Sequence, residues 1–189
     1  LQLPKMPKLK FNFKSMKPGY FFPLIISLVI ACQSGKQRDN KQEIDPKLVE
    51  EPLLHANRQA IKAEDEQITD LIRRYKWTME ETGTGLRYSI YHHGKGPMAE
   101  TGKIAVLRYS VRLITGDEIY NSDRDGLKEF MIGRGGVESG LEEGILLLRV
   151  GDRAKFIIPS HLGFGLLGDQ DKVPPKSTLI YDLELVSLH

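Results

Sequence analysis

The stretch VESGLEEGILLLRVGDRAKFIIPSHLGFGLLGDQDKVPP, residues 137–175, decides the fold because a helix, a strand and a long loop follow one another in it. Ser139 and Glu142 have the spacing of a capping box, and apolar residues then recur at helical intervals until Gly151. The helix is therefore expected to have one apolar face, formed by Leu141, Ile145 and Leu148. A single helix of this kind needs a curved sheet to cover that face.

Two strands are predicted on the C-terminal side of this helix. In Arg153–Ile158 apolar residues alternate with charged ones, which is the period of a half-buried strand, and Pro159 ends the pattern. A loop closing on Pro174 and Pro175 then leads to a second strand, Thr178–Leu188. One face of that strand is apolar, formed by Leu179, Tyr181, Leu183 and Leu185.

The residues before this stretch predict more strands. Thr82–Gly85 breaks a preceding helical pattern, and Ile104–Leu113 alternates between apolar and polar residues. We therefore predict an α+β fold in which a curved antiparallel half-barrel of about five strands wraps one short helix that begins near Gly140. An N-terminal helical extension precedes this half-barrel.

These motifs resemble the FK506-binding-protein (FKBP) type of peptidyl-prolyl cis-trans isomerase. The motifs that carry the resemblance are, in chain order, VLRYSVRL, YNSDRDG, FMIG, VESGLEEG, VGDRAKFIIP, GFG, VPP and LIYDLELVSL. The resemblance covers residues 83–189 and implies an FKBP-like half-barrel. It also implies an enzyme that rotates X-Pro bonds in proline-containing protein clients and needs no cofactor and no metal.

The resemblance further implies a set of pocket residues. Those expected to be catalytic are Tyr109, Tyr120, Asn121, Phe130, Phe164 and Tyr181. Those expected to bind substrate are Val137, Glu138 and Leu141, with Glu138 offering its backbone N–H to a substrate carbonyl and turning its side chain to water.

Three of these positions depart from the family pattern. Asn121 stands where the family usually has Asp, Leu141 where it commonly has Trp, and Phe164 where it has Tyr. The implied pocket is deeper, less aromatic and less charged than is usual. We expect lower activity and weaker drug binding as a result.

A closer resemblance is to the gliding-motility-associated isomerase lipoproteins of gram-negative bacteria. It is carried by RRYKW at residues 73–77, by TGTGLRY at residues 82–88 and by the long string at residues 137–175. This resemblance implies clients that are exported proteins.

The N-terminus has the pattern of a signal peptide, predicted for residues 1–31. Five Lys and no acidic residue precede or flank a short apolar run that ends in Val29-Ile30-Ala31-Cys32. The run is shorter than the roughly 20 residues that span a bilayer. Because this ending resembles a lipobox, Cys32 is the expected lipid attachment site, and the mature protein is expected on a membrane of the cell envelope, facing the periplasm.

The mature chain is expected to be mildly acidic. Removal of residues 1–31 changes the formal net charge from +2 to −3, because only lysines are lost among the charged residues. A chain of this charge without a basic stripe is not expected to bind nucleic acid.

Two segments are predicted between Cys32 and the half-barrel. Residues 32–50 are polar and aperiodic, which is typical of a flexible tether. Residues 51–82 form a helical arm with a narrow apolar stripe at seven-residue spacing, made of Leu54, Ile61, Ile68 and Tyr75. The stripe suits either a dimerisation or client-holding arm or docking onto the chain's own barrel. Polar Asn57 and Glu64 between these positions favour docking and a monomer.

Several other constellations are not expected to carry chemistry. His92 and His93 would point to opposite sides of a strand, so they are poor joint metal ligands. The glycine-rich residues 133–136 precede a helix but are followed by acidic residues that would repel a phosphate, and a turn is the better interpretation. Glu142 and Glu143 are expected to complement the helix dipole rather than to act as an acid and a base.

The predicted function is prolyl isomerisation that assists the folding of exported proteins. Two other functions stay open from the sequence. One is a non-catalytic chaperone that only holds clients, and the other is a structural lipoprotein of a gliding motility or secretion assembly.

Overall fold

The structure is a computed structural model that describes residues 46–189. The predicted signal peptide, the predicted lipid attachment site at Cys32 and most of the predicted tether lie outside the described residues. No helix in the described part of the chain is long and apolar enough to cross a membrane.

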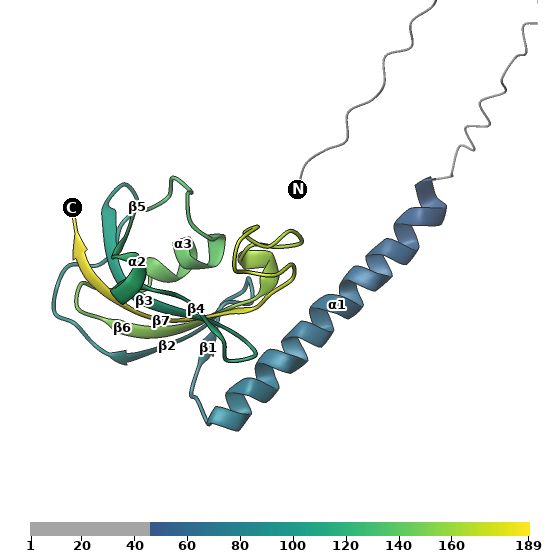
Figure 1. Cartoon of the computed structure of the whole chain (residues 1–189), viewed down its shortest axis with the longest axis horizontal. Coiled ribbons are helices and arrows are strands. Elements are labelled where there is room, and N and C mark those ends of the chain that lie inside the picture. The colour runs from purple at the N-terminus through teal and green to yellow at the C-terminus, as the bar shows by residue number, and fades with distance from the viewer. Residues whose placement is uncertain (1–45) are drawn as a thin grey trace, which may run out of the picture. The chain divides into compact units, whose positions relative to one another are not determined.

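Seven strands, three α-helices and one 3-10 turn make up the described residues (Figure 1). The helices are α1 (Pro46–Tyr75), α2 (Ser122–Asp125) and α3 (Ser139–Ile145), and the 3-10 turn is η1 (Ser160–Leu162). The strands are β1 (Glu80–Glu81), β2 (Arg87–His92), β3 (Ile104–Leu113), β4 (Glu118–Asn121), β5 (Lys128–Met131), β6 (Arg153–Ile158) and β7 (Leu179–Leu188).

The strands form one open antiparallel sheet in the order β1-β2-β6-β7-β3-β4. β7 pairs with β3 along its whole length, from Leu113 opposite Leu179 to Ala105 opposite Leu188. The other edge of β3 is shared, because β5 pairs with its first half and β4 with its second half. The sheet curves around α3, so the predicted curved antiparallel sheet around one short helix is confirmed, with seven strands where about five were expected (Figure 1).

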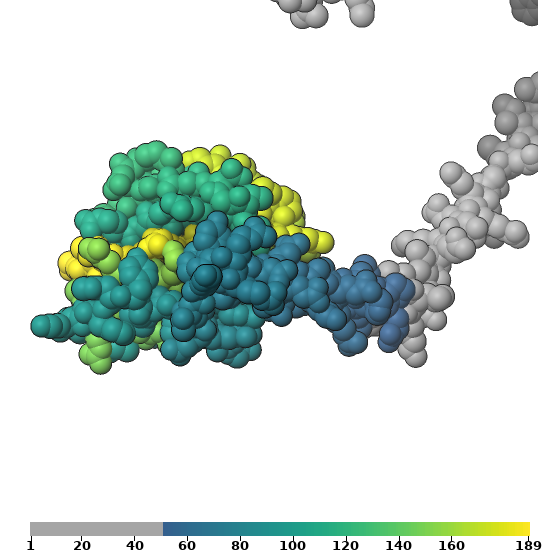
Figure 2. Space-filling model, turned by 90° about the horizontal axis from the view of Figure 1, so that it is seen from below, coloured from purple at the N-terminus to yellow at the C-terminus, as the bar shows by residue number. Residues whose placement is uncertain are grey.

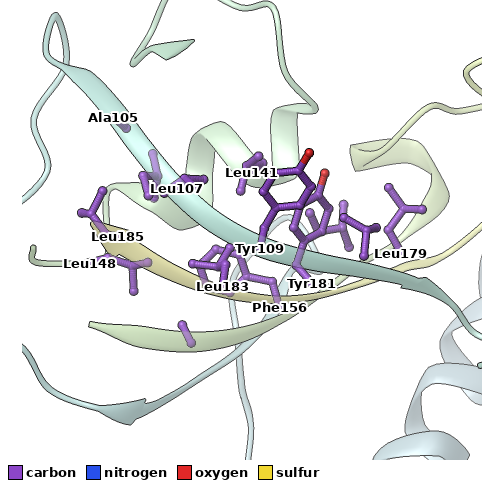
Figure 3. Close-up of a cluster of buried hydrophobic side chains, with 14 of the residues drawn as sticks. Ala105, Leu107, Tyr109, Leu141, Leu148, Phe156, Leu179, Tyr181, Leu183 and Leu185 are labelled. Atoms are coloured by element: carbon purple, nitrogen blue, oxygen red, sulfur yellow. The ribbon is translucent and has the colours of Figure 1, made fainter. Parts of the chain in front are cut away.

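The core lies between α3 and the concave face of the sheet (Figure 3). The predicted apolar faces are buried in it, including Leu141 of α3, Phe156 of β6 and Tyr181 of β7. Gly144 lets α3 approach the sheet closely, because a Cβ at this position would lie 2.5 Å from the Phe156 ring. The helix and the sheet are therefore matched in shape as well as in polarity.

The start and the end of α3 differ from the sequence prediction. The N-cap is Glu138, one residue before the expected Ser139, and the Ser139 hydroxyl donates to the Leu162 carbonyl at 3.1 Å instead. The helix ends at Ile145 and not near Gly151. The predicted capping box is therefore wrong, because the loop after β6 passes close enough to take the Ser139 hydroxyl.

The Glu142 carboxylate also has a partner that the sequence did not predict. It accepts the backbone N–H of Gly133 at 2.6 Å and that of Gly135 at 3.0 Å. The glycine-rich turn before α3 thus holds an anionic group of the protein itself. Its amides are satisfied by Glu142, which fits the expectation that this segment is a turn and not a phosphate site.

Helix α1 packs on the convex face of the sheet through its last turns (Figure 2). Ile68 and Leu71 are buried against Ile157 of β6 and Ile180 of β7. The same apolar stripe is largely exposed toward the start of the helix, where Ile61 keeps 47% of its surface open against 1% for Ile68. The stripe therefore docks on the chain's own barrel, but only in part.

The beginning of α1 corrects the predicted tether. The helix starts at Pro46, so residues 46–50 are helical, although the sequence analysis placed them in the flexible segment.

The docked end of α1 is also held by ion pairs, because the nearly buried Arg87 guanidinium binds Asp65 at 2.5 Å and Glu81 at 2.9 Å.

Candidate active site

A cavity of about 840 Å³ opens beside the start of α3. Its walls come from β3, β4, the end of α2, β5, the segment that leads into α3, the first residue of α3 and the loop between β6 and β7. The residues that line it are Tyr109, Tyr120, Asp125, Lys128, Gly136, Val137, Glu138, Ser139, Gly163, Phe164, Asp169 and Asp171.

Five of the nine predicted site residues line this cavity, namely Tyr109, Tyr120, Val137, Glu138 and Phe164. They come from four separate segments of the chain, which the fold brings together around one space. Their side chains include three aromatic rings, so the wall is apolar for much of its area.

Three more of the predicted residues lie in the core beneath the cavity. Phe130, Leu141 and Tyr181 are buried and belong to the same apolar cluster. The centroids of the Tyr181 and Tyr109 rings lie 6.5 Å apart, and Figure 3 shows both rings next to Leu141. These residues support the cavity from below and are not among the residues that line it.

Asn121 is the one predicted site residue that neither lines the cavity nor belongs to the core cluster. It is the N-cap of α2, where its Oδ1 accepts the Asp123 backbone N–H at 2.9 Å. Its Nδ2 donates to Glu118 at 3.1 Å, and the residue lines a different groove that also contains Arg112. The Asn121 side chain is thus engaged in capping and does not line the cavity.

The Glu138 side chain is buried, in contrast to the expectation that it faces water. It keeps 2% of its surface exposed, and its Oε1 accepts a hydrogen bond from the Tyr181 hydroxyl at 2.6 Å. Its Oε2 has no hydrogen-bond partner among the described residues and lies 3.7 Å from Lys128 Nζ. The expectation came from the family resemblance, and the partner that buries this carboxylate, Tyr181, lies 43 residues further along the chain.

Burial and this carboxylate keep the nearby tyrosines neutral. Burial first, and then the Glu138 charge, raise the pKa of Tyr181 well above its ordinary value. Burial, Asp125 and Glu138 raise the pKa of Tyr109 in the same direction. Both hydroxyls therefore stay protonated, and able to donate hydrogen bonds, further into the alkaline range than an ordinary tyrosine.

Lys128 is a cavity residue that sequence reasoning missed. Its Nζ lies 5.6 Å from the centroid of the Tyr109 ring, within the range of a cation–π contact. Lys128 and Phe130 share one face of β5, since side chains alternate along a strand. The family resemblance assigned Phe130 to the site. The structure instead places Lys128 in the cavity wall and Phe130 in the core.

The loop between β6 and β7 closes the cavity on one side. It contributes Phe164 and Asp169, and the Tyr120 hydroxyl donates a hydrogen bond to the Asp169 carboxylate. Asp169 also accepts the backbone N–H groups of Asp171 at 2.9 Å and Val173 at 2.7 Å. Burial alone would raise the pKa of Asp169, but the hydrogen bonds from Tyr120 and the backbone outweigh it and lower the pKa.

The cavity contains no arrangement for nucleophilic or metal catalysis. No histidine or cysteine lines it in the described part of the chain, and residues 46–189 contain no cluster of three potential metal ligands. His92 and His93 are exposed, away from these walls. What the site offers is a half-enclosed space lined by aromatic and apolar side chains, with charged side chains such as Asp125, Lys128 and Asp169 also in its lining.

Comparison with known sequences identifies relatives of this domain. Residues 96–186 match the family model of the FKBP-type peptidyl-prolyl cis-trans isomerases. FK506-binding protein 2 of Dictyostelium discoideum is 40% identical over 91 residues, which are 48% of this chain and 68% of that protein. FkpA of Escherichia coli K12, an FKBP-type peptidyl-prolyl cis-trans isomerase, is 33% identical over 110 residues, 58% of this chain but only 40% of FkpA.

Comparison with solved structures points the same way. The crystal structure of Escherichia coli FkpA aligns with a TM-score of 0.60 at 26% identity, covering 77% of this chain and 74% of that one. The residues that match the family model include the cavity walls, the strands β3 to β6 and β7 as far as Val186. The chain belongs to the FKBP-type peptidyl-prolyl cis-trans isomerase family.

Proposed function

We propose that this chain catalyses the cis–trans isomerisation of X-Pro bonds in exported proteins and thereby assists their folding. The observation that carries the proposal is the cavity, in which Tyr109, Tyr120, Val137 and Phe164 form an apolar wall over a buried floor. A proline ring with its preceding peptide bond is a small, mostly apolar group that suits such a space.

The chemistry needs no bond to be broken. Amide resonance opposes rotation with a barrier of about 18–20 kcal/mol, and unassisted X-Pro bonds isomerise in tens to hundreds of seconds. The twisted transition state has lost conjugation and part of its dipole, so a water-poor apolar site favours it over the planar ground state. A rate enhancement of about 10⁵ requires only about 7 kcal/mol of such preference.

The start of α3 offers a hydrogen bond for the substrate. None of the hydrogen bonds found among the described residues uses the backbone N–H of Glu138, which lies in the cavity wall. In the proposed complex this N–H donates to a carbonyl of the substrate and orients the proline ring toward the floor. Tyr181 and Leu141 then define how deep the ring can enter.

The proposal is tested by a protease-coupled assay with proline-containing peptides on the unmodified chain. We expect the chain to accelerate isomerisation well beyond the spontaneous rate. A chain that suppresses aggregation of an unfolded protein but shows no turnover would be a non-catalytic chaperone. A chain with neither property would fit a structural component of a motility or secretion assembly.

We further propose that residues 1–31 are removed and that Cys32 carries a lipid, which holds the isomerase on a membrane of the cell envelope. The support is the short apolar run ending at Cys32, the only cysteine in the sequence. Labelled palmitate should be incorporated into the unmodified protein and not into Cys32→Ser. Equal incorporation into both proteins would remove this part of the proposal.

A role in gliding motility rests on the sequence resemblance alone. The proposed clients are exported proteins that fold slowly at X-Pro bonds. In a gliding host, loss of the protein should slow gliding, and a version with an inactive cavity should fail to restore it. Full restoration by the inactive version would favour the structural role.

A further inference from the structure

The loop that closes the cavity is held at both of its stems by one side chain from outside the loop. The Glu64 carboxylate of α1 accepts the Ser160 backbone N–H at 2.6 Å and the Ser160 hydroxyl at 2.8 Å. The same carboxylate accepts the Thr178 hydroxyl at 2.6 Å. Ser160 follows β6 and Thr178 precedes β7, so Glu64 joins the two points where the loop leaves and rejoins the sheet.

The position of Glu64 is itself fixed. Its neighbour Asp65 binds the nearly buried Arg87, and Ile68, one turn further along α1, is buried on the sheet. The carboxylate is partly buried, and Thr178 keeps only 3% of its surface exposed. Hydrogen bonds to a charged acceptor in such surroundings are stronger than those between neutral groups.

Inside the loop, further contacts carry this restraint to the cavity wall. The Lys176 N–H donates to the Gly165 carbonyl at 2.8 Å, which ties the second stem to the residue after Phe164. At the far end, Tyr120 donates to Asp169. The loop is therefore fixed at its stems by α1 and at its tip by β4, with Phe164 between these points.

We propose that Glu64 is a positioning residue for the cavity. It does not line the cavity and touches no substrate. It holds the stems of the loop together so that Phe164 and Asp169 stay in the wall. The docked end of α1 is then a working part of the isomerase site, not only a connection to the tether. This inference rests on the proposed isomerase function for its kinetic consequence, but its structural part does not.

The test compares four variants with the unmodified chain. Glu64→Ala removes all three hydrogen bonds, while Glu64→Gln keeps an acceptor for Ser160 and Thr178. Glu66→Ala is the matched control, because Glu66 is an exposed glutamate of the same helix whose carboxylate meets only Lys62, at 3.9 Å. Hydrogen exchange of the amides at 163–173 reports the loop directly, and the proline-peptide assay reports kcat and KM.

For Glu64→Ala we expect loop exchange at least tenfold faster and a KM raised about fivefold or more, with a smaller change in kcat. In Glu64→Gln both loop exchange and KM should stay close to the values of the unmodified chain, and Glu66→Ala should match that chain. Ser160→Ala removes one of the three hydrogen bonds and should change loop exchange and KM in the same direction by a smaller amount. It replaces Glu64→Ala in the test if Glu64→Ala folds poorly.

Unchanged loop exchange in both Glu64→Ala and Ser160→Ala would overturn the inference. Equal effects of Glu64→Ala and Glu66→Ala would also overturn it, because the cause would then be the charge of α1. An unmodified chain without turnover would contradict the proposed function, and the exchange measurement would still decide whether Glu64 holds the loop.

Discussion

The two faces of the sheet are covered in different ways. On the concave face α3 and the loops bury an extensive cluster that includes Phe156 and Tyr181. On the convex face α1 buries only a small one, centred on Ile68 and Leu71 over Ile157 and Ile180. We therefore expect the concave side to supply most of the stability of the domain and the convex side to hold α1 in place.

The largest effect is expected from a change on the concave face. Phe156→Ala removes a fully buried ring that contacts α3 at Gly144, and we expect the free energy of unfolding to fall by about 3–5 kcal/mol. Urea denaturation of the chain from Gln33 measures this value. A loss below about 1.5 kcal/mol would mean that the concave core is not the main source of stability.

A smaller effect is expected on the convex face, where the seven-residue stripe provides its own control. Ile68→Ala should cost about 2 kcal/mol, because the side chain is buried, and should loosen α1 without unfolding the barrel. Ile61→Ala should cost less than about 0.5 kcal/mol, since Ile61 is half exposed.

Analytical ultracentrifugation of the same proteins tests whether the chain is a monomer in solution. We expect a monomer for the unmodified fragment and for both variants. If the unmodified fragment forms a dimer that Ile61→Ala weakens more than Ile68→Ala, the stripe would serve association rather than docking.

The floor of the cavity gives the third prediction. Leu141 stands where the family commonly has Trp, and it is fully buried beside Phe156 and Tyr181. Leu141→Trp should therefore overfill the floor and destabilise the domain by about 1–3 kcal/mol. An unchanged thermal midpoint together with tighter ligand binding would show that the floor has room for the larger ring.

The buried carboxylate of the cavity gives a smaller expected change. Glu138→Gln keeps an acceptor for the Tyr181 hydroxyl, so turnover should stay within about threefold. If the variant is folded and inactive, as judged by circular dichroism and the peptide assay, a proton-transfer role for Glu138 would follow.

We expect kcat/KM to change little between about pH 5 and 9. The pKa of Asp169 is lowered on folding, so its contribution to loop stability is complete above its ordinary range and is lost as the pH falls through the lower folded value. The pKa of Tyr120 is raised by burial and by Asp169, so its hydroxyl stays protonated until strongly alkaline pH. A steep change in kcat/KM near neutral pH would contradict catalysis by desolvation.

Much of the fold follows from periodicity alone. β3 and β6 have the predicted bounds, and β7 begins one residue after the predicted start. Strand alternation is a strong local signal when only one face is buried, which is the case for these strands except where α1 covers Ile157 and Ile180. The seven-residue stripe was less informative, because only the tertiary contact with Ile157 and Ile180 decides which part of it is covered.

The site was less predictable because its details depend on contacts between distant segments. Nothing near Glu138 in the sequence indicates that Tyr181 will bind its side chain, and nothing near Glu64 indicates Ser160 and Thr178. Asn121 was assigned by its position in a motif, and its capping of α2 depends on local geometry that a motif does not encode.

The most direct test of catalysis by an apolar cavity is the kcat/KM of the unmodified chain and of Phe164→Ala in the proline-peptide assay. Phe164 is a partly exposed wall residue, so its removal should admit water to the cavity with little loss of stability. We predict turnover by the unmodified chain and a reduction of about tenfold or more in Phe164→Ala, at an unchanged thermal midpoint. Full activity of Phe164→Ala, or no turnover by the unmodified chain, would contradict this account.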